Sequence, residues 1–325
     1  MSNVRIGFVG AGGFARYRIG NMLKVSDAKV VAMVDPSANQ IDQTRNSYPQ
    51  LADVPAYSTT EAMYDDVKLD AVVIQTPHAF HAPQILEAFS HKCHVCCEKP
   101  LVATVEEAHQ VIAARDKAKK VGMVSYQRHT QGEFLLIREL IGSGKYGAVQ
   151  MVHALLSQEW KRLTANTWRQ KKELSCGGQL NDSGSHMLDI LLWVTGLAPK
   201  RVSALTDHRG TEVDINSTLN IQFEGGALGS VCILGDGANW HEDLTIACDR
   251  ATFYVRGGEL TIVEENGTKL RVENPPGMGT PDQHFVDAIL GRVPLIATFE
   301  DALKVARLTQ AAWASEEKGG APVDA

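Results

Sequence analysis

The stretch CHVCCEKP, residues 93–100, places three thiols, an imidazole and a lysine close together. Thiolates and imidazoles bind transition metals, but a structural zinc site needs four such ligands at a suitable spacing. The chain has only six cysteines, and no second Cys/His cluster completes a set of four. We therefore expect no metal, and we expect Cys93, Cys96 and Cys97 to lie on a buried strand, as free cysteines often do. The chemistry of this stretch must then come from the residues after Cys97.

A glycine-rich stretch, FVGAGGFAR, offers a different chemistry. Gly10, Gly12 and Ala15 form a G-x-G-x-x-A pattern directly after an apolar run. In this pattern the first glycine permits a tight turn, the second lets the backbone approach a pyrophosphate, and the alanine allows close packing of helix on strand. Asp35 stands 20 residues after Ala15, where a carboxylate accepts hydrogen bonds from the adenosine ribose. The combination predicts a dinucleotide site, and a plain glycine-rich turn is the alternative interpretation.

The residues after Asp35 bear on the choice of cofactor. Pro36 and Ser37 stand where a 2'-phosphate would need an arginine. A phosphate would therefore meet the carboxylate without a cationic partner, so we expect NAD rather than NADP. Gly13, Phe14 and Ser37 flank the two motifs and are predicted to contact the cofactor as well.

A third candidate is the stretch QTPHAFHAP, which follows another β-branched apolar run. Open α/β sheets bind their ligands at the carboxyl ends of the strands. We therefore expect Thr76, Pro77, His78 and His81 to line the cofactor cleft. For each histidine alone, an exposed loop position or a helix cap is an equally good interpretation.

These motifs need a scaffold, and the first third of the chain predicts one. Short β-branched runs alternate with longer amphipathic segments, which is typical of parallel βαβ units. The expected strands are NVRIGFVG, KVVAMVD, DAVVIQT, CHVCC and VGMVSY, and the expected helices cover residues 14–25, 39–48, 82–90 and 104–119. We interpret residues 1–125 as a Rossmann domain with a doubly wound parallel sheet, an α/β fold.

The remainder of the chain, residues 126–325, has a different pattern. Closely spaced strands with Gly and Asn turns predict an α+β domain built on one large, mostly antiparallel sheet. Its expected strands cover residues 201–206, 215–223, 227–234, 244–247 and 252–255, and its expected helices cover residues 184–195, 281–290 and 300–317. We expect this domain to bind substrate and to mediate oligomerisation, with the C-terminal helix able to pack back on the first domain.

Composition narrows the class of partner. The 325 residues include 38 acidic and 32 basic side chains, a net charge of −6, and the basic residues are scattered. This argues against nucleic acid as the main partner. No basic leader followed by an apolar run is present, and no apolar stretch reaches the length needed to cross a bilayer. We therefore expect a cytoplasmic globular protein without a membrane partner, acting on a small molecule.

With GAGGFA, Asp35, TPHAFH and EKP in this order, the chain resembles the glucose-fructose oxidoreductase and inositol dehydrogenase family (Gfo/Idh/MocA). The stretch GGQLNDSGSHMLDILLWVTG is similar to the family's second signature, D-x-G-x-H-x-x-D after a pair of glycines, and LTQAAWASEEKGGAPV is similar to its closing helix. The resemblance implies an NAD-dependent dehydrogenase of a cyclic polyol, sugar or sugar derivative. It also implies a homodimer or homotetramer.

The resemblance places the reaction centre at Lys99, Asp182 and His186. Oxidation of a carbinol carbon moves a hydride to the nicotinamide while a base removes the hydroxyl proton. An imidazole, with an intrinsic pKa of about 6.5, suits the role of base, and a lysine stabilises alkoxide character. Asp182 would share a helix face with His186 if the segment is helical there. Its carboxylate would then orient the His186 imidazole or bind a second hydroxyl group of the substrate. The structural alternative is that Asp182 caps the helix and His186 packs inertly.

Other residues of the expected site carry weaker signals. The resemblance puts Glu98, Gln127 and Arg128 near the nicotinamide or the substrate, and Pro100 in a turn that aims Lys99, with a peptide that is often cis in the family. Trp168 and Arg169 lie in a loop that could cover a sugar ring, although core packing and a surface ion pair explain them equally well. Trp160 and the segment NWHED carry fainter signals still.

Three alternatives to a sugar dehydrogenase remain open from the sequence. One is a glycoside hydrolase of the same fold that uses NAD transiently. Another is a non-catalytic NAD-binding regulator, against which the presence of both Lys99 and His186 argues. A third is action on a non-carbohydrate. His78 stands where the family usually has asparagine, and Asn181 stands where many relatives have an apolar residue, so these departures bear on the substrate.

Overall fold

The computed structural model describes residues 3–325, which divide into two compact units. The first unit contains residues 3–102, Glu106–Gln127 and Gly279–Glu300, and the second contains Ala103–Val105, Arg128–Met278 and Asp301–Ala325. A segment near the end of the chain thus returns to the first unit. Most of the C-terminal helix belongs to the second.

The first unit is built on a six-stranded sheet in the order β3-β2-β1-β4-β5-β6, in which every pair of neighbours is parallel. Its strands are β1 (Val4–Val9), β2 (Ala28–Val34), β3 (Ala56–Tyr57), β4 (Ala71–Ile74), β5 (His94–Cys97) and β6 (Gly122–Val124). This confirms the predicted Rossmann sheet. The sequence did not reveal β3, because two residues are too few to show an alternating pattern.

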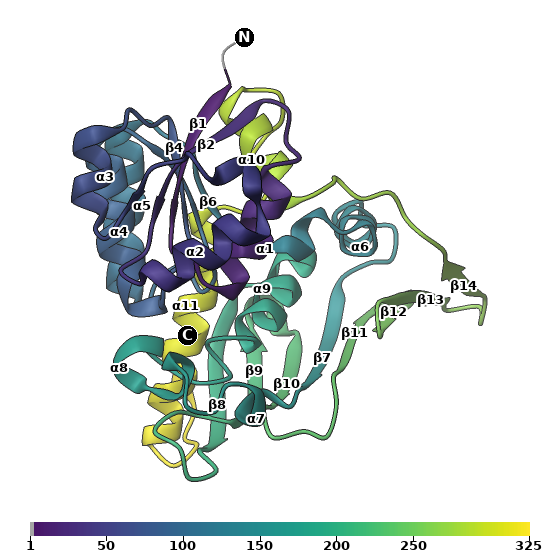
Figure 1. The fold of residues 1–325 in the computed structure, drawn as a ribbon. Coiled ribbons are helices and arrows are strands. Elements are labelled where there is room, and N and C mark those ends of the chain that lie inside the picture. Colours follow the sequence, from purple (N-terminus) through teal and green to yellow (C-terminus); the bar gives the residue numbers. More distant parts are fainter. Residues whose placement is uncertain (1–2) are drawn as a thin grey trace. The chain divides into compact units, whose positions relative to one another are not determined.

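Helices cover both faces of this sheet, as buried parallel strands require. Figure 1 shows α3 (Thr60–Asp66), α4 (His81–Ser90) and α5 (Val105–Ala118) on one side, and α1 (Gly13–Met22) and α2 (Ala38–Ser47) on the other. The returning segment adds α10 (Pro281–Ile289), which contacts α1. The order of strands makes β1 and β4 neighbours, so the chain reverses direction across the sheet between them, which is where such folds bind ligands.

The second unit is built on a nine-stranded sheet in the order β14-β13-β12-β11-β7-β10-β9-β8-β15. Its strands are β7 (Val149–Ser157), β8 (Pro199–Asp207), β9 (Asn216–Phe223), β10 (Leu228–Leu234), β11 (His241–Cys248), β12 (Ala251–Arg256), β13 (Glu259–Glu264), β14 (Lys269–Val272) and β15 (Val323–Asp324). All neighbouring pairs are antiparallel except β7 and β10. The prediction of a mostly antiparallel sheet is confirmed.

One face of this sheet is buried beneath helices of its own unit. There α9 (Gly184–Thr195) contacts both β7 and α6 (Gly132–Gly142), and ten of the twelve residues of α9 are buried. The long helix α11 (Phe299–Glu317) and two short helices, α7 (Trp160–Leu163) and α8 (Lys172–Ser175), complete the unit (Figure 1). The bounds of α9 match the sequence prediction, whereas α6 and the central strand β7 were missed.

Among residues 3–325 no helix is long and apolar enough to cross a membrane.

Candidate active site

The glycine-rich loop joins β1 to α1 at the carboxyl end of the parallel sheet. Gly10 has a φ of +98°, and a Cβ there would lie 2.7 Å from the Gln75 carbonyl oxygen, so only glycine fits. At Gly12, the residue before α1, a Cβ would meet nothing within 4 Å. Open space therefore lies at the N-terminus of α1, whose first turn carries no acidic side chain. Such a helix end attracts phosphate.

Asp35 follows β2 and is fixed by two backbone groups. Its Oδ2 accepts a hydrogen bond from the Ala11 N–H at 2.8 Å, and its Oδ1 accepts one from the Ser37 N–H at 2.9 Å. The carboxylate lines a cavity of 280 Å³ together with Tyr57 and Arg45. The open cradle at Gly12 and the carboxylate beside this cavity fit the pyrophosphate and the adenosine of a dinucleotide.

Arg45 is a basic residue of this cavity that the residues next to Asp35 do not reveal. An arginine for a 2'-phosphate was expected directly after Asp35, whereas Arg45 comes from the third turn of α2. Its Nη2 donates to the Val54 carbonyl at 3.0 Å. A cation therefore lies beside the cavity that Asp35 lines, which weakens the sequence argument against a 2'-phosphate.

The loop after β4 holds two histidines, and both are buried. His78 is 4% exposed and its ring lies 5.7 Å from that of His81. The ring nitrogens of His81 contact the Pro100 carbonyl at 2.8 Å and the Thr76 carbonyl at 2.9 Å. Burial lowers the pKa of His81, although both carbonyls oppose this. His81 therefore ties the TPHAFH loop to the EKP loop.

The EKP residues follow β5 directly. The Lys99–Pro100 peptide is cis. Glu98 is 8% exposed, and its Oε1 accepts hydrogen bonds from Arg18 at 2.6 Å and from the Gln75 amide at 3.4 Å. Lys99 is half-buried at the same edge of the sheet as the glycine-rich loop, because both follow the carboxyl ends of parallel strands.

The cysteines of the CHVCC stretch are buried, as predicted. Burial raises the pKa of Cys96 to about 12 and that of Cys97 well above its ordinary value. Burial likewise raises the pKa of Cys93 to about 11. These thiols stay protonated near neutral pH, and only thiolates are good ligands and nucleophiles. Within residues 3–325, no group of three or more His, Cys, Asp or Glu side chains could hold a metal ion.

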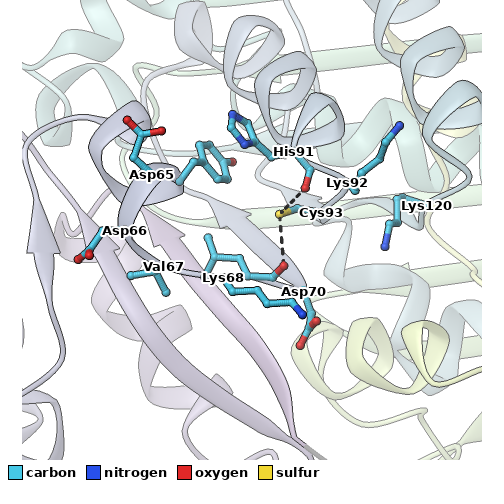
Figure 2. A pocket seen from close by; sticks show the side chains of 11 residues that line it. Asp65, Asp66, Val67, Lys68, Asp70, His91, Lys92, Cys93 and Lys120 are labelled. Carbon is cyan, nitrogen blue, oxygen red and sulfur yellow. Dashed lines mark hydrogen bonds between the residues drawn. The ribbon is translucent and has the colours of Figure 1, made fainter.

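A separate cavity of 560 Å³ lies at the opposite, amino edge of the same sheet (Figure 2). Cys93, which immediately precedes β5, and Asp70, which immediately precedes β4, line it. The Tyr64 and His91 rings stack at 4.2 Å, and Lys68, Lys92 and Lys120 also contribute to the wall. The cavity is remote from Gly10 and Lys99 along the strands, so we do not assign it to the dinucleotide site.

In the second unit, Asp182 is the centre of a polar cluster. The residue is 4% exposed, and its Oδ2 accepts a hydrogen bond from the Trp160 indole at 2.8 Å and one from Arg169 Nε at 3.0 Å. The Arg169 guanidinium stacks on the Trp168 ring at 4.4 Å. The structure thus brings together three residues predicted to bind substrate. It adds Trp160, to which the sequence gave little weight.

His186 lies in the first turn of α9, which begins at Gly184. Asp182 therefore precedes the helix, and the conditional expectation that it shares a helical face with His186 is not met. The N-cap residue of α9 is Ser183, whose side chain makes no capping hydrogen bond, so Asp182 does not occupy the cap position that the structural alternative gave it. The Asp182 carboxylate accepts hydrogen bonds from Trp160 and Arg169.

A buried aspartate that the sequence did not single out shapes the loop before Asp182. Asp214 accepts hydrogen bonds from the N–H groups of Gly178 at 3.0 Å and Leu180 at 2.8 Å, and from the Trp313 indole at 3.2 Å. A Cβ at Gly178 would overlap the backbone of Asp214, which explains the second glycine of the pair. Burial raises the pKa of Asp214, and the three donors oppose this.

The remaining predicted residues lie on either side of the division between the units. Gln127 is the last residue of its stretch in the first unit, and Arg128 begins the second. Arg128 is 8% exposed and its Nη2 donates to both carboxylate oxygens of Glu242 at 2.7 Å. Phe14, a predicted cofactor contact, is 52% exposed. Glu242 belongs to the NWHED segment, where no periodic pattern in the sequence indicated that it would pair with Arg128.

Two family models match the chain. One, described as an oxidoreductase family with an NAD-binding Rossmann fold, matches residues 4–126. The other, described as a GFO/IDH/MocA C-terminal domain, matches residues 134–254. The two together cover most of the chain: the first spans the six-stranded sheet, and the second spans β7 to β11 of the nine-stranded sheet.

Several curated proteins are similar to the chain. A D-glucoside 3-dehydrogenase of Escherichia coli (strain K12) is 32% identical over 212 residues, which are 62% of this chain and 57% of that protein. A 1,5-anhydro-D-fructose reductase of Ensifer adhaerens is 25% identical over 284 residues, covering 85% and 79% of the two chains. An NADP-linked scyllo-inositol 2-dehydrogenase of Bacillus subtilis is 26% identical over 204 residues, covering 63% and 55%.

Solved structures of low sequence identity share the fold. An aldose-aldose oxidoreductase from Caulobacter crescentus, complexed with glycerol, superposes with a TM-score of 0.86 at 21% identity over 99% of this chain and 100% of that one. The WlbA dehydrogenase from Bordetella pertussis, in complex with NADH and UDP-GlcNAcA, gives 0.85 at 22% identity over 99% of each chain. A levoglucosan dehydrogenase complexed with NADH gives 0.86 at 20% identity over 99% of each.

Proposed function

Because the chain belongs to the Gfo/Idh/MocA family of oxidoreductases, we propose that it is an NAD-dependent dehydrogenase of a cyclic polyol, sugar or sugar derivative. The observation that carries this proposal is the buried Asp182 carboxylate, held by an indole and a guanidinium directly before the helix that bears His186. Aromatic, cationic and anionic groups in one place suit a ligand with several hydroxyl groups. The names of the relatives, which include glucoside and inositol dehydrogenases, support this class of substrate.

The first unit offers the groups that would hold the dinucleotide. The N-terminus of α1, behind the open space at Gly12, would face the pyrophosphate. The Asp35 carboxylate, oriented by the N–H groups of Ala11 and Ser37, would accept hydrogen bonds from the ribose hydroxyl groups. When bound, NAD supplies an acceptor for the hydride that leaves the carbinol carbon.

The chain's own residues would remove the hydroxyl proton of the substrate and stabilise the charge that this leaves. In the oxidative direction His186 would take up the proton of the hydroxyl group, which leaves negative charge on the oxygen. Lys99 would donate a hydrogen bond to that oxygen and stabilise its charge. Asp182 would accept a hydrogen bond from a neighbouring hydroxyl group, which fixes the carbon that faces the cofactor.

The proposal can be tested with three proteins and two matched controls. Inositols, hexoses and anhydrosugars are screened with NAD, and reduction of the cofactor is followed by its absorbance. Lys99→Ala and His186→Ala should lower turnover of the best substrate by about 10² or more while NAD binding, measured by calorimetry, is kept. Lys68→Ala and His208→Ala replace exposed residues of the same types and should be close to the parent.

The pH dependence provides a further constraint. With His186 as the base, oxidation should rise with pH through one ionisation, and His186→Ala should remove that step. Near-normal turnover of Lys99→Ala or His186→Ala, in a protein whose thermal melting is unchanged, would place the chemistry on other residues. Release of a leaving group from a glycoside without net reduction of NAD would instead favour the hydrolase.

A further inference from the structure

The first unit contains a buried arginine that none of the sequence motifs includes. Arg18 lies in α1, two turns after the glycine-rich loop, and is 4% exposed. Every nitrogen of its guanidinium contacts an acceptor. Nε and Nη2 donate to the Asp282 carboxylate at 2.9 to 3.1 Å, Nη1 donates to Glu98 and to the Ser125 hydroxyl, and Nη2 also faces the Cys96 sulfur at 3.8 Å.

The two carboxylates come from segments far apart in the sequence. Asp282 is fully buried in α10, on the segment that returns to the first unit. Glu98 is the residue before Lys99, and its Oε1 lies 2.6 Å from Arg18 Nη1. Burial alone would lower the pKa of Arg18, but Asp282, Cys96 and Glu98 raise it above its ordinary value, so the guanidinium stays charged.

The Glu98 carboxylate links the Arg18 guanidinium to the backbone of Lys99. While Oε1 binds Arg18, the other oxygen, Oε2, accepts a hydrogen bond from the backbone N–H of Lys99 at 3.3 Å. Oε1 also accepts from the Gln75 amide at 3.4 Å, and the Gln75 backbone packs against Gly10. The Glu98 carboxylate therefore links the backbone at Lys99, directly after β5, to the glycine-rich loop through Gln75.

Stability alone does not require such a group. Burying ions is costly, and apolar residues of similar size often replace a buried ion pair without loss of stability. A salt bridge from the middle of α1 could simply anchor α10, but the unit also has Arg292 for that purpose. The Arg292 guanidinium joins Asp287 at the end of α10 to Asp27 at 3.0 and 2.7 Å, at the surface.

We propose that Arg18 is a positioning residue for the reaction: it fixes the Glu98 carboxylate between α1 and the backbone of Lys99, and so sets where the Lys99 ammonium lies relative to the cofactor loop. This inference rests on the proposed role of Lys99. A reacting group displaced by about 1 Å can lose about 10² in rate. Loss of Arg18 should therefore lower kcat while the KM for NAD stays close to that of the parent.

The kinetic test uses the full-length protein, NAD and the best substrate of the screen described above. Arg18→Ala should lower kcat by about 10² with less than a threefold change in the KM for NAD, and Arg18→Lys, which keeps the charge without the planar fork, should fall in between. Arg292→Ala removes the surface arginine that also anchors α10 and should leave kcat unchanged. An equal loss in Arg292→Ala, or a normal kcat in Arg18→Ala, would overturn the proposal.

A second readout does not depend on turnover. Hydrogen exchange measured by mass spectrometry should show faster exchange at the Lys99 N–H in Arg18→Ala, because its acceptor is released. Millimolar guanidinium chloride, compared with sodium chloride at equal ionic strength, should restore both the slow exchange and part of kcat in Arg18→Ala but do neither in Lys99→Ala. If Arg18→Ala is unstable, the same measurements on Arg18→Lys decide the matter: unchanged exchange at Lys99 would refute the positioning role.

The design separates this inference from the proposed function. If Lys99→Ala keeps normal turnover, the proposed reaction centre is wrong. If Lys99→Ala is inactive while Arg18→Ala turns over normally, the reaction centre stands and only the role of Arg18 fails.

Discussion

His94, inside the CHVCC stretch, should make the first unit sensitive to acid. The residue begins β5, and its Nδ1 accepts a hydrogen bond from the Val121 backbone N–H at 2.9 Å. Nδ1 must therefore be unprotonated in the folded state. Burial and the nearby Lys120 lower the pKa of His94 from 6.5 to about 4, while Asp70 opposes this.

The direction of the effect follows from proton binding. In the unfolded chain the imidazole takes up a proton as the pH falls below about 6.5, whereas the folded protein resists this down to about 4. Between these values the unfolded state binds more protons, so acid favours unfolding. The contribution of His94 is complete above pH 6.5 and is lost as the pH falls towards 4.

The same two pKa values give the size of the change in the free energy of unfolding. A pKa lowered from 6.5 to about 4 corresponds to about 3 kcal/mol, because each tenfold change in proton affinity is worth about 1.4 kcal/mol. His94 is only partly buried, and solvent screens part of its interaction with Lys120. We therefore expect the free energy of unfolding to fall, between about pH 7 and about pH 4.5, by about 2 kcal/mol more than it would if His94 did not titrate.

The assay is urea unfolding at several pH values between about 7 and about 4.5, followed by circular dichroism. Tryptophan fluorescence is unsuitable, because Trp160, Trp168, Trp193, Trp240 and Trp313 all lie in the second unit. His94→Asn keeps an acceptor for the Val121 N–H but cannot titrate, so its stability should fall less with acid. His208→Asn, at an exposed position, should behave like the parent. Equal acid sensitivity of His94→Asn and the parent would refute the reasoning.

Two further predictions concern the cofactor and the assembly. The catalytic efficiency should be higher with NAD than with NADP, and Asp35→Ala should narrow the gap by relieving repulsion of the 2'-phosphate; equal or better use of NADP by the parent would contradict this. We also expect a homodimer or homotetramer formed through the face of the nine-stranded sheet that carries Met151 and Leu228, cross-strand neighbours that are 53% and 50% exposed. Analytical ultracentrifugation of the parent and of Leu228→Asp should show dissociation in the variant, and a monomeric parent at micromolar concentration would rule out the assembly.

Local sequence patterns predicted the Rossmann half of the fold and the cofactor motif. The turn at Gly10, the start of α1 and the spacing to Asp35 all lie within one βαβ unit, so adjacent residues encode them. The apolar run of α9 between Gly184 and Gly196 likewise fixed the ends of that helix, since glycine ends helices in the left-handed conformation that Gly196 adopts. Short elements such as β3, α7 and α8 were missed because they offer too few residues to show a period.

The partners of the buried charges came only from the tertiary structure. Arg18 and Asp282 are 264 residues apart, and Trp160 reaches Asp182 from a helix of four residues. No periodicity links such pairs, because each residue's local pattern reports only whether it is buried and not which group it meets. The same holds for β7, which takes the central place between β11 and β10 by pairing with residues that follow it by 77 to 99 positions. Sequence alone thus determined which residues could do chemistry, and long-range packing decided which side chains hold them in place.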